Sequence, residues 1–257
     1  MTGTFRVKVS GKPDIHCRVQ GSGPAVTLLH GVGANLDSSD EVAQRMRGRF
    51  RIICMDLAGR GKSGGLHGDR TLQDFADDVG RVWDHLGLCK AHLAGFSLGG
   101  LLAQSLALSH SDRINRLVIL SAVAGRTAEE RAKVVDRLAL LKTGGIPAVS
   151  AAAEDRWFTP EFRQRHPERV ARRMRELLAN DPVSYAAAYT VFATSDLGDR
   201  VGEICLPTLI ATGEHDLGSN VRMARMMHDA ITGSELHTYQ VCAIPCWWRP
   251  RSRWPTC

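Results

Sequence analysis

The sequence predicts an α/β protein with a mostly parallel central sheet that is flanked by helices and interrupted by a helical lid. Short apolar segments are typical of strands covered on both faces, and helix-forming segments separate them. A glycine-rich turn with a central serine follows one of these strands and leads into a helix. The 257 residues, 44% hydrophobic and 23% charged, are enough for one main core.

An antiparallel hairpin is expected at the start of the chain. Apolar and polar residues alternate over 5–9 and 15–19, on either side of turn residues 11–14. The pattern then changes to short apolar strands separated by helices, which is the order of a parallel sheet. These strands and helices are expected, in chain order, at 25–29, 40–47, 51–55, 72–86, 91–94, 101–108 and 117–120.

Ser97 lies in a Gly-x-Ser-x-Gly turn between an expected strand and an expected helix. Gly95 and Gly99 let backbone pass close on either side, so that the serine hydroxyl projects above the edge of the sheet. The helix that follows presents free N–H groups toward developing negative charge. The pentapeptide alone would also fit a helix-capping serine, but with these flanks we interpret Ser97 as a catalytic nucleophile.

His30-Gly31-Val32-Gly33 directly follows the strand at 25–29. A turn of this composition can be purely structural. Because it precedes the Gly-x-Ser-x-Gly turn and ends a parallel strand, it favours a catalytic loop. We predict that the N–H groups of Val32 and Leu98 together form an oxyanion hole.

Gly61-Lys62-Ser63 has the ending of a phosphate-binding loop. That motif requires a glycine five positions before Gly61, and Asp56 stands there instead. We therefore exclude nucleotide binding at this loop.

The sheet pattern stops at residue 121, and helices are expected at 128–141, 147–154, 167–178 and 182–192. An insertion of this length between two strands predicts a lid. Within it, Arg156 and Trp157 combine a cation with a bulky aromatic ring just before a helix start. Packing within the lid and contact with a substrate explain these two residues equally well.

The sheet resumes at 207–212, and Asp216 follows the end of this strand. Its place at the same edge as Ser97 suits a carboxylate that orients an imidazole and stabilises its cationic form. A helix-capping role is the structural alternative, and we interpret Asp216 as the acid of a catalytic triad. The expected parts of the chain are a core of residues 1–121 and 197–239, a lid of residues 122–196, and an irregular tail of residues 240–257.

The order of these motifs resembles the α/β-hydrolase fold family, up to about Tyr239. Within that family, the segment Arg156-Trp157-Phe158-Thr159 with Pro182 and Tyr185 is similar to the lid of 3-oxoadipate enol-lactonases, which hydrolyse an anionic lactone. The resemblance implies that Arg156 meets the substrate carboxylate and that Trp157 lines the pocket. It also implies that no metal or organic cofactor is required.

The chain departs from this family at two places. The family usually shows Asp-x-Arg-Gly-His-Gly-x-Ser where this chain has Ala58 and Arg60, which concerns local packing. The triad histidine is also missing from the loop after the last strand, roughly 25 to 30 residues after the acid. Residues 240–257 instead hold three of the seven Cys, three of the five Trp, three Pro and three Arg, without an acid.

A shift of reading frame explains the missing histidine. Tyr239 to Ile244 can be encoded TAC CAG GTC TGC GCC ATT, and one C restored after TAC gives Tyr-Pro-Gly-Leu-Arg-His. The histidine then replaces Ile244, 28 positions after Asp216. Several codon choices are free, so the hypothesis is a one-base deletion, in the gene or in its sequencing, that also removes the terminal helix and lowers solubility.

The other candidate bases fit less well. His237 belongs to the expected last strand, His215 adjoins the acid, and His228 lies in an expected helix. We expect each of them to be structural or exposed.

Composition indicates a soluble, cytoplasmic protein. Residues 1–8 lack the apolar block of a signal peptide, and no run of 18 apolar residues occurs. The net charge of +6 is scattered among acids, which argues against nucleic acid as a partner, and no membrane partner is expected. The cysteines have no metal-type pairing, and we expect the first four to be buried thiols: Cys17, Cys54, Cys89 and Cys205.

Together the residues predict a serine hydrolase that cleaves a small carboxylic ester or lactone through an acyl-enzyme and is impaired as written. Two alternatives remain open. One is a non-catalytic small-molecule binding protein on a hydrolase scaffold, and the other is a C–C hydrolase or cofactor-free haloperoxidase that uses the same site. The oligomeric state is left open.

Overall fold

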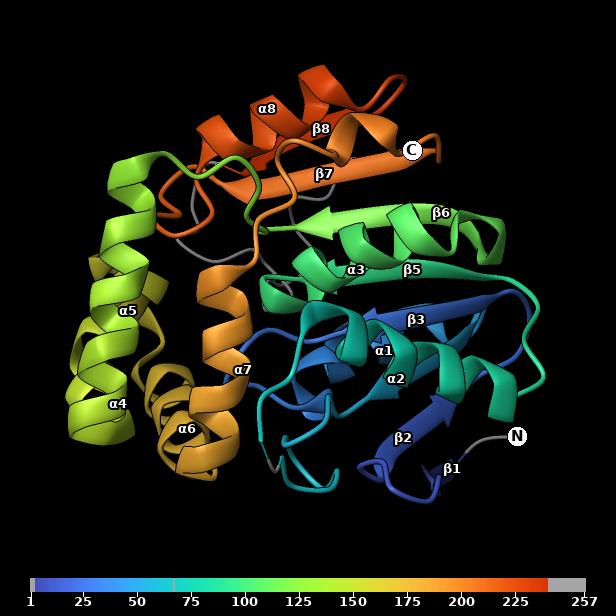
Figure 1. The fold of residues 1–257 in the computed structure, drawn as a ribbon, viewed down its shortest axis with the longest axis horizontal. Coiled ribbons are helices and arrows are strands. Elements are labelled where there is room, and N and C mark those ends of the chain that lie inside the picture. Colours follow the sequence, from blue (N-terminus) through green and yellow to red (C-terminus); the bar gives the residue numbers. More distant parts are fainter. Residues whose placement is uncertain (1–2, 67, 240–257) are drawn as a thin grey trace.

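The computed structural model describes residues 3–66 and 68–239. The described residues form one eight-stranded sheet in the order β1-β2-β4-β3-β5-β6-β7-β8. Figure 1 shows β1 and β8 at its opposite edges. Both pairings of β2, with β1 and with β4, are antiparallel, and the other neighbours are parallel. The strands are β1 (Gly3–Val7), β2 (Ile15–Gln20), β3 (Ala25–Leu29), β4 (Arg51–Met55), β5 (Ala91–Phe96), β6 (Ile114–Leu120), β7 (Thr208–Gly213) and β8 (Glu235–Tyr239). The predicted fold class is confirmed.

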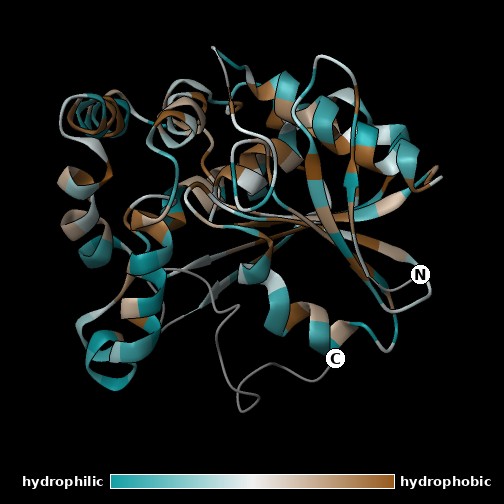
Figure 2. Cartoon of the chain, turned by 90° about the horizontal axis from the view of Figure 1, so that it is seen from below, coloured by the Kyte–Doolittle hydropathy of each residue, from teal (hydrophilic) through white to brown (hydrophobic). Residues whose placement is uncertain are grey.

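Helices cover both faces of the sheet. Residues of α2, α3 and α8 pack in the core cluster on one face, and α1 packs on the other. Figure 2 shows the mixed polar and apolar character of the flanking helices. The helices are α1 (Asp40–Met46), α2 (Leu72–His85), α3 (Leu98–Ser109), α4 (Ala128–Trp157), α5 (Pro160–Arg165), α6 (Pro167–Leu178), α7 (Pro182–Thr194) and α8 (Val221–Ala230).

Strand β3 shows why a central strand is apolar at nearly every position. All five of its residues are buried. Val26 and Leu28 contribute to the core cluster on one face, whereas Ala25 and Leu29 contribute to the other. Because neither face meets water, the alternation of polar and apolar residues disappears.

Helices α4 to α7 connect β6 to β7 and stand beyond the carboxyl ends of the parallel strands (Figure 1). Helix α4 has two arms, separated at Gly145, whose φ of 68° interrupts the helix just before Pro147. The helices predicted at 128–141 and 147–154 lie in these two arms. Arg156 and Trp157 belong to the last turn of α4.

Two smaller predictions are wrong. Val9 is outside β1, because its carbonyl accepts a hydrogen bond from Lys12 N–H (3.1 Å) and so belongs to the turn. Cys89 and Cys205 are exposed, since both lie in connections between elements, whereas Cys17 and Cys54 are buried in strands. Burial raises the pKa of each of these two buried thiols to about 12.

No helix in residues 3–66 and 68–239 is long and apolar enough to cross a bilayer. The tail at 240–257 lies outside the described residues, and so do the proposed frame shift and the position of the expected histidine.

A hydrogen bond ties α2 to the centre of the sheet, and its loss should destabilise the fold. Trp83 Nε1–H donates to Thr27 Oγ1 (2.8 Å), and both residues are buried. Thr27→Val removes the acceptor and leaves the indole N–H unpaired, so the free energy of unfolding should fall by about 1–3 kcal/mol in urea denaturation. In the double variant with Trp83→Phe, the loss should be smaller than the sum of the two single losses, and strict additivity would contradict this account.

Candidate active site

The carboxyl ends of β3, β5, β6 and β7 meet at one edge of the sheet. The strand register aligns their last residues, Leu29 with Gly95, Phe96 with Leu120, and Leu120 with Ala211. The segments that follow these strands therefore lie close together. They carry the loop 30–33, Ser97, Ser121 and Asp216.

Ser97 forms the turn between β5 and α3 with the backbone angles φ 54° and ψ −115°. A non-glycine residue at positive φ is strained, and such strain is characteristic of a serine held out from a strand-to-helix turn. The turn closes tightly. A Cβ atom on Gly95 would lie 2.0 Å from the carbonyl oxygen of Gly99, and one on Gly99 would lie 2.4 Å from the carbonyl oxygen of Leu29.

Two backbone amides next to Ser97 are free. In the described part of the chain, neither Val32 N–H nor Leu98 N–H has a hydrogen-bond acceptor. Leu98 is the first residue of α3, where unpaired N–H groups carry partial positive charge. Both amides can therefore serve an anion at this edge of the sheet.

The loop that contains Val32 is hydrogen-bonded to helix α6 and to the turn that follows this helix. The Gly33 carbonyl accepts hydrogen bonds from Arg173 Nη1 (2.9 Å) and from Asn180 Nδ2 (3.2 Å). The guanidinium of Arg173 also lies over the ring of Trp157, 4.6 Å from its centroid. These contacts fix the position of the loop relative to Ser97.

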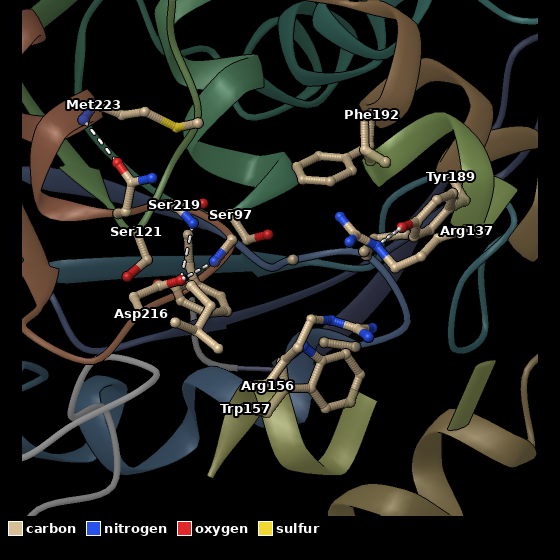
Figure 3. A pocket seen from close by; sticks show the side chains of 18 of the residues that line it. Ser97, Ser121, Arg137, Arg156, Trp157, Tyr189, Phe192, Asp216, Ser219 and Met223 are labelled. Carbon is tan, nitrogen blue, oxygen red and sulfur yellow. Dashed lines mark hydrogen bonds between the residues drawn. The ribbon is translucent and has the colours of Figure 1, made fainter. Parts of the chain in front are cut away.

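Asp216 is buried after β7. One carboxylate oxygen, Oδ1, accepts the N–H groups of Gly218 (2.9 Å) and Ser219 (2.8 Å). Burial raises the pKa of Asp216 to about 6, although hydrogen bonds from Ser219, Ser121 and Gly218 act in the opposite direction. Figure 3 shows Asp216, Ser121 and Ser97 on one side of the cavity.

His30 lines the cavity but has both ring nitrogens engaged. Its Nε2 accepts Leu57 N–H (3.0 Å), and its Nδ1 is 2.8 Å from the carbonyl oxygen of Gly31, so Nδ1 must carry the proton. Burial lowers the pKa of His30 to about 4. His30 is therefore neutral and supports the loop through its two hydrogen bonds, and it has no free nitrogen to accept a proton from Ser97.

The three alternative histidines are away from the cavity wall. His237 is exposed on β8, 3.8 Å from a carboxylate oxygen of Glu235, and His215 is also exposed. His228 lies on α8, and its Nδ1 is 2.9 Å from Ser234 Oγ. Within residues 3–66 and 68–239, the structure thus brings no histidine with a free nitrogen to Ser97.

A cavity of about 480 Å³ lies between the strand ends and helices α4 to α7. Five of the predicted site residues line its wall: Val32, Ser97, Arg156, Trp157 and Asp216. Leu98 is buried behind Ser97 and contributes through its backbone. Figure 3 shows Ser97 on the side of Asp216, with Arg156 and Trp157 across the cavity.

The family model for the alpha/beta hydrolase fold matches residues 24–250. The chain belongs to the alpha/beta hydrolase fold family. The resemblance inferred from the order of the motifs is thereby confirmed.

The relatives of this chain include proteins named as a hydrolase and as lactonases. It is 31% identical to (E)-2-((N-methylformamido)methylene)succinate hydrolase of Acinetobacter baylyi, over 90% of the chain and 87% of the relative. It is 28% identical to 3-oxoadipate enol-lactonase 2 of the same organism, over 88% and 84%. The crystal structure of the enol-lactonase from Burkholderia xenovorans superposes with a TM-score of 0.87 at 27% identity, over 93% of this chain and 92% of that one.

Arg60 occupies a position where this hydrolase departs from the family pattern. Its side chain is buried, and its Nη2 donates to the Ser184 carbonyl (3.0 Å) while Nη1 donates to Asn180 Oδ1 (3.2 Å). Its guanidinium lies 5.1 Å from the ring centroid of Tyr185. The departure is therefore accommodated by packing that joins the loop after β4 to α7.

Several wall residues of the hydrolase were not predicted as part of the site: Ser121, Arg126, Arg137, Arg173 and Tyr189. Ser121 could have been predicted from the sequence, because it directly follows a parallel strand, β6, as Ser97 follows β5 and Asp216 comes shortly after β7. The arginines carry no such signal, because basic residues occur throughout the insertion. No group of three or more potential metal ligands occurs among the described residues.

The tight turn predicts opposite effects for two glycine substitutions. Gly95→Ala should abolish the soluble folded protein, because its Cβ would overlap the backbone of α3. Gly80→Ala is the matched control, since a Cβ at this position in α2 has no atom within 4 Å. We expect it to leave stability unchanged or raise it by up to about 1 kcal/mol in thermal and urea denaturation. Normal folding of the Gly95 variant would refute the steric argument.

The buried carboxyl of Asp216 should make stability depend on pH. Its pKa is raised from 3.8 to about 6, so the folded state binds a proton more tightly than the unfolded chain does. The stabilisation is complete below pH 4 and is lost as the pH rises to about 6, a change of about 3 kcal/mol. Relative to Asp216→Asn, the wild-type free energy of unfolding should fall across this range; parallel curves would contradict the prediction.

Proposed function

We propose that this hydrolase cleaves a small carboxylic ester or lactone through an acyl-enzyme on Ser97. The observation that carries this proposal is the strained Ser97 turn on the cavity wall, next to two amides that have no acceptor among the described residues. The enol-lactonase relatives support the same reaction class.

In the proposed reaction, Ser97 Oγ attacks the acyl carbon and loses its proton to a general base. The N–H groups of Val32 and Leu98 stabilise the oxyanion of the tetrahedral intermediate. Collapse of this intermediate breaks the C–O bond, and the base returns the proton to the leaving oxygen. Water then hydrolyses the acyl-enzyme, with Asp216 holding the imidazole in its productive orientation.

The base is the missing part of this scheme. We propose that it is the histidine that the restored frame places at position 244, and that the chain as written lacks it. Without a base, only the oxyanion hole and substrate binding remain, and they supply roughly 10³- to 10⁴-fold acceleration over water. The raised pKa of Asp216 is consistent with this, because no cation of the described residues faces its carboxylate.

We further propose that residues 122–196 act as the lid over a core of 1–121 and 197–239, and that the substrate is anionic. Arg156 is half-buried on the cavity wall and suits a substrate carboxylate, and Trp157 offers an apolar surface beside it. The relative named 3-oxoadipate enol-lactonase favours a lactone with a free carboxylate.

A non-catalytic binding protein is the second candidate. The observation in its favour is that the described residues offer Ser97 no base, although they form a cavity that could hold a small molecule. C–C hydrolysis and cofactor-free halide oxidation on the same site remain alternatives that a substrate panel separates.

Expression of both reading frames tests the proposal. After the DNA is resequenced across codons 236 to 250, the written and restored frames are assayed with an enol-lactone and p-nitrophenyl acetate. We expect the restored frame to hydrolyse the lactone and the written frame to be roughly 10⁴- to 10⁶-fold slower.

Ser97→Ala in the restored frame serves as the control and should abolish both turnover and labelling by a fluorophosphonate probe. Normal turnover by a genuine written frame would disprove the missing-base account. Absence of turnover and of labelling in both frames would favour the binding protein.

A further inference from the structure

Two arginines reach the cavity from the two arms of α4. Arg137 lies on the arm before Gly145, and Arg156 lies on the last turn of the arm after it. Both side chains line the cavity wall. Figure 3 shows them on the side opposite Asp216, with Tyr189 next to Arg137.

Their hydrogen-bonding capacity is mostly unused. Arg137 Nε donates to the hydroxyl oxygen of Tyr189 (3.1 Å), which is buried on α7. In the described part of the chain, the terminal nitrogens of Arg137 and the whole guanidinium of Arg156 have no hydrogen-bond acceptor and no ion pair. Burial lowers the pKa of Arg156, and the charge of Arg137 lowers it further.

The acids around them have other partners. Asp155 pairs with Arg163 (2.5 Å), and Glu129 pairs with Lys133 (3.6 Å). Glu130 accepts from Thr127 N–H, Asn220 and Arg222. Among the described residues, no acid forms an ion pair with Arg137 or Arg156, although the charge of Asp155 still favours the charged form of Arg156.

Two other arginines of the wall differ in this respect. Arg126 donates to the carbonyls of Ser195 and Phe192, both at 2.8 Å. Arg173 donates to the Gly33 carbonyl. These two guanidinium groups support the backbone of the site, whereas Arg137 and Arg156 present free N–H groups to the cavity.

Two unpaired cations that repel each other in a partly desolvated cavity are unfavourable until anions offset them. A guanidinium binds a carboxylate through two parallel N–H donors, so each arginine fits one carboxylate. The two groups come from separate arms of α4, which suits two separate carboxylates better than one compact dianion.

We propose that Arg137 is a second carboxylate-binding residue beside Arg156, held in place by Tyr189, and that the cavity takes a substrate with two carboxylates. The ester or lactone bond of that substrate rests on the proposed function. The recognition of two carboxylates does not depend on it, because binding is measurable without turnover.

Calorimetry on the Ser97→Ala protein tests the proposal, with succinate, glutarate and adipate against butyrate and inorganic phosphate. We expect at least one dicarboxylate to bind about tenfold or more tightly than butyrate and phosphate. Arg137→Gln should remove this preference while leaving butyrate binding within about twofold. Arg137→Lys, which keeps the charge, should retain part of it, and Tyr189→Phe should weaken dicarboxylate binding more than butyrate binding.

Arg200→Gln is the matched control, because this substitution removes the same charge away from the cavity wall. Arg200 is exposed and pairs with Glu203. The substitution should leave every affinity unchanged. The proposal would be overturned by equal binding of dicarboxylate and butyrate or by tighter binding of phosphate. It would also be overturned if Arg137→Gln and Arg200→Gln lost dicarboxylate affinity to the same extent. A dicarboxylate preference without hydrolysis in either frame would overturn the proposed function alone, and hydrolysis without the preference would overturn this inference alone.

Discussion

Close contact between the backbones of β5 and α3 is the constraint on which the site depends. The helix begins so near the strand that a single methyl group on Gly95 or Gly99 would meet carbonyl oxygens at 2.0 and 2.4 Å. This contact leaves Ser97 as the residue that must turn the chain, at a positive φ. It also brings the start of α3 against the end of β3, so that the amides of Leu98 and Val32 share one edge of the sheet with the serine hydroxyl.

Charge is distributed unevenly across the cavity. On the side of the sheet, burial raises the pKa of Asp216, and no cation in residues 3–66 and 68–239 faces its carboxylate. On the side of the insertion, Arg137 and Arg156 form no ion pair with an acid of the described residues. The first imbalance is what the loss of an imidazolium would leave behind, and the second is suited to an anionic ligand. In the proposed scheme, the core carries the reacting groups, and the insertion carries the groups that select the ligand.

Much of the fold follows from the sequence because burial leaves a direct mark on it. Strand β3 is apolar at nearly every position since both of its faces are covered, and Ser97 and Asp216 are recognisable because each follows such a strand. Arg137 is different. Helical periodicity says which side of α4 it occupies, but the packing of α4 against α7 and the sheet ends decides whether that side meets the cavity. Tyr189 and Ser121 likewise acquire their roles only through neighbours distant in sequence, and the exposure of Cys205 depends on how its connection lies over the sheet.

The hydrogen bonds to the Gly33 carbonyl connect the insertion with the loop that we propose to be catalytic. Arg173 and Asn180 come from the insertion, yet the carbonyl that they hold belongs to the loop with the Val32 amide. An insertion grafted from another member of the family would change the walls of the cavity and at the same time release this loop, unless it supplied equivalent donors. Under the proposed function, exchanging the insertion alone would therefore not transfer a substrate range, because the new insertion must also supply donors for the Gly33 carbonyl.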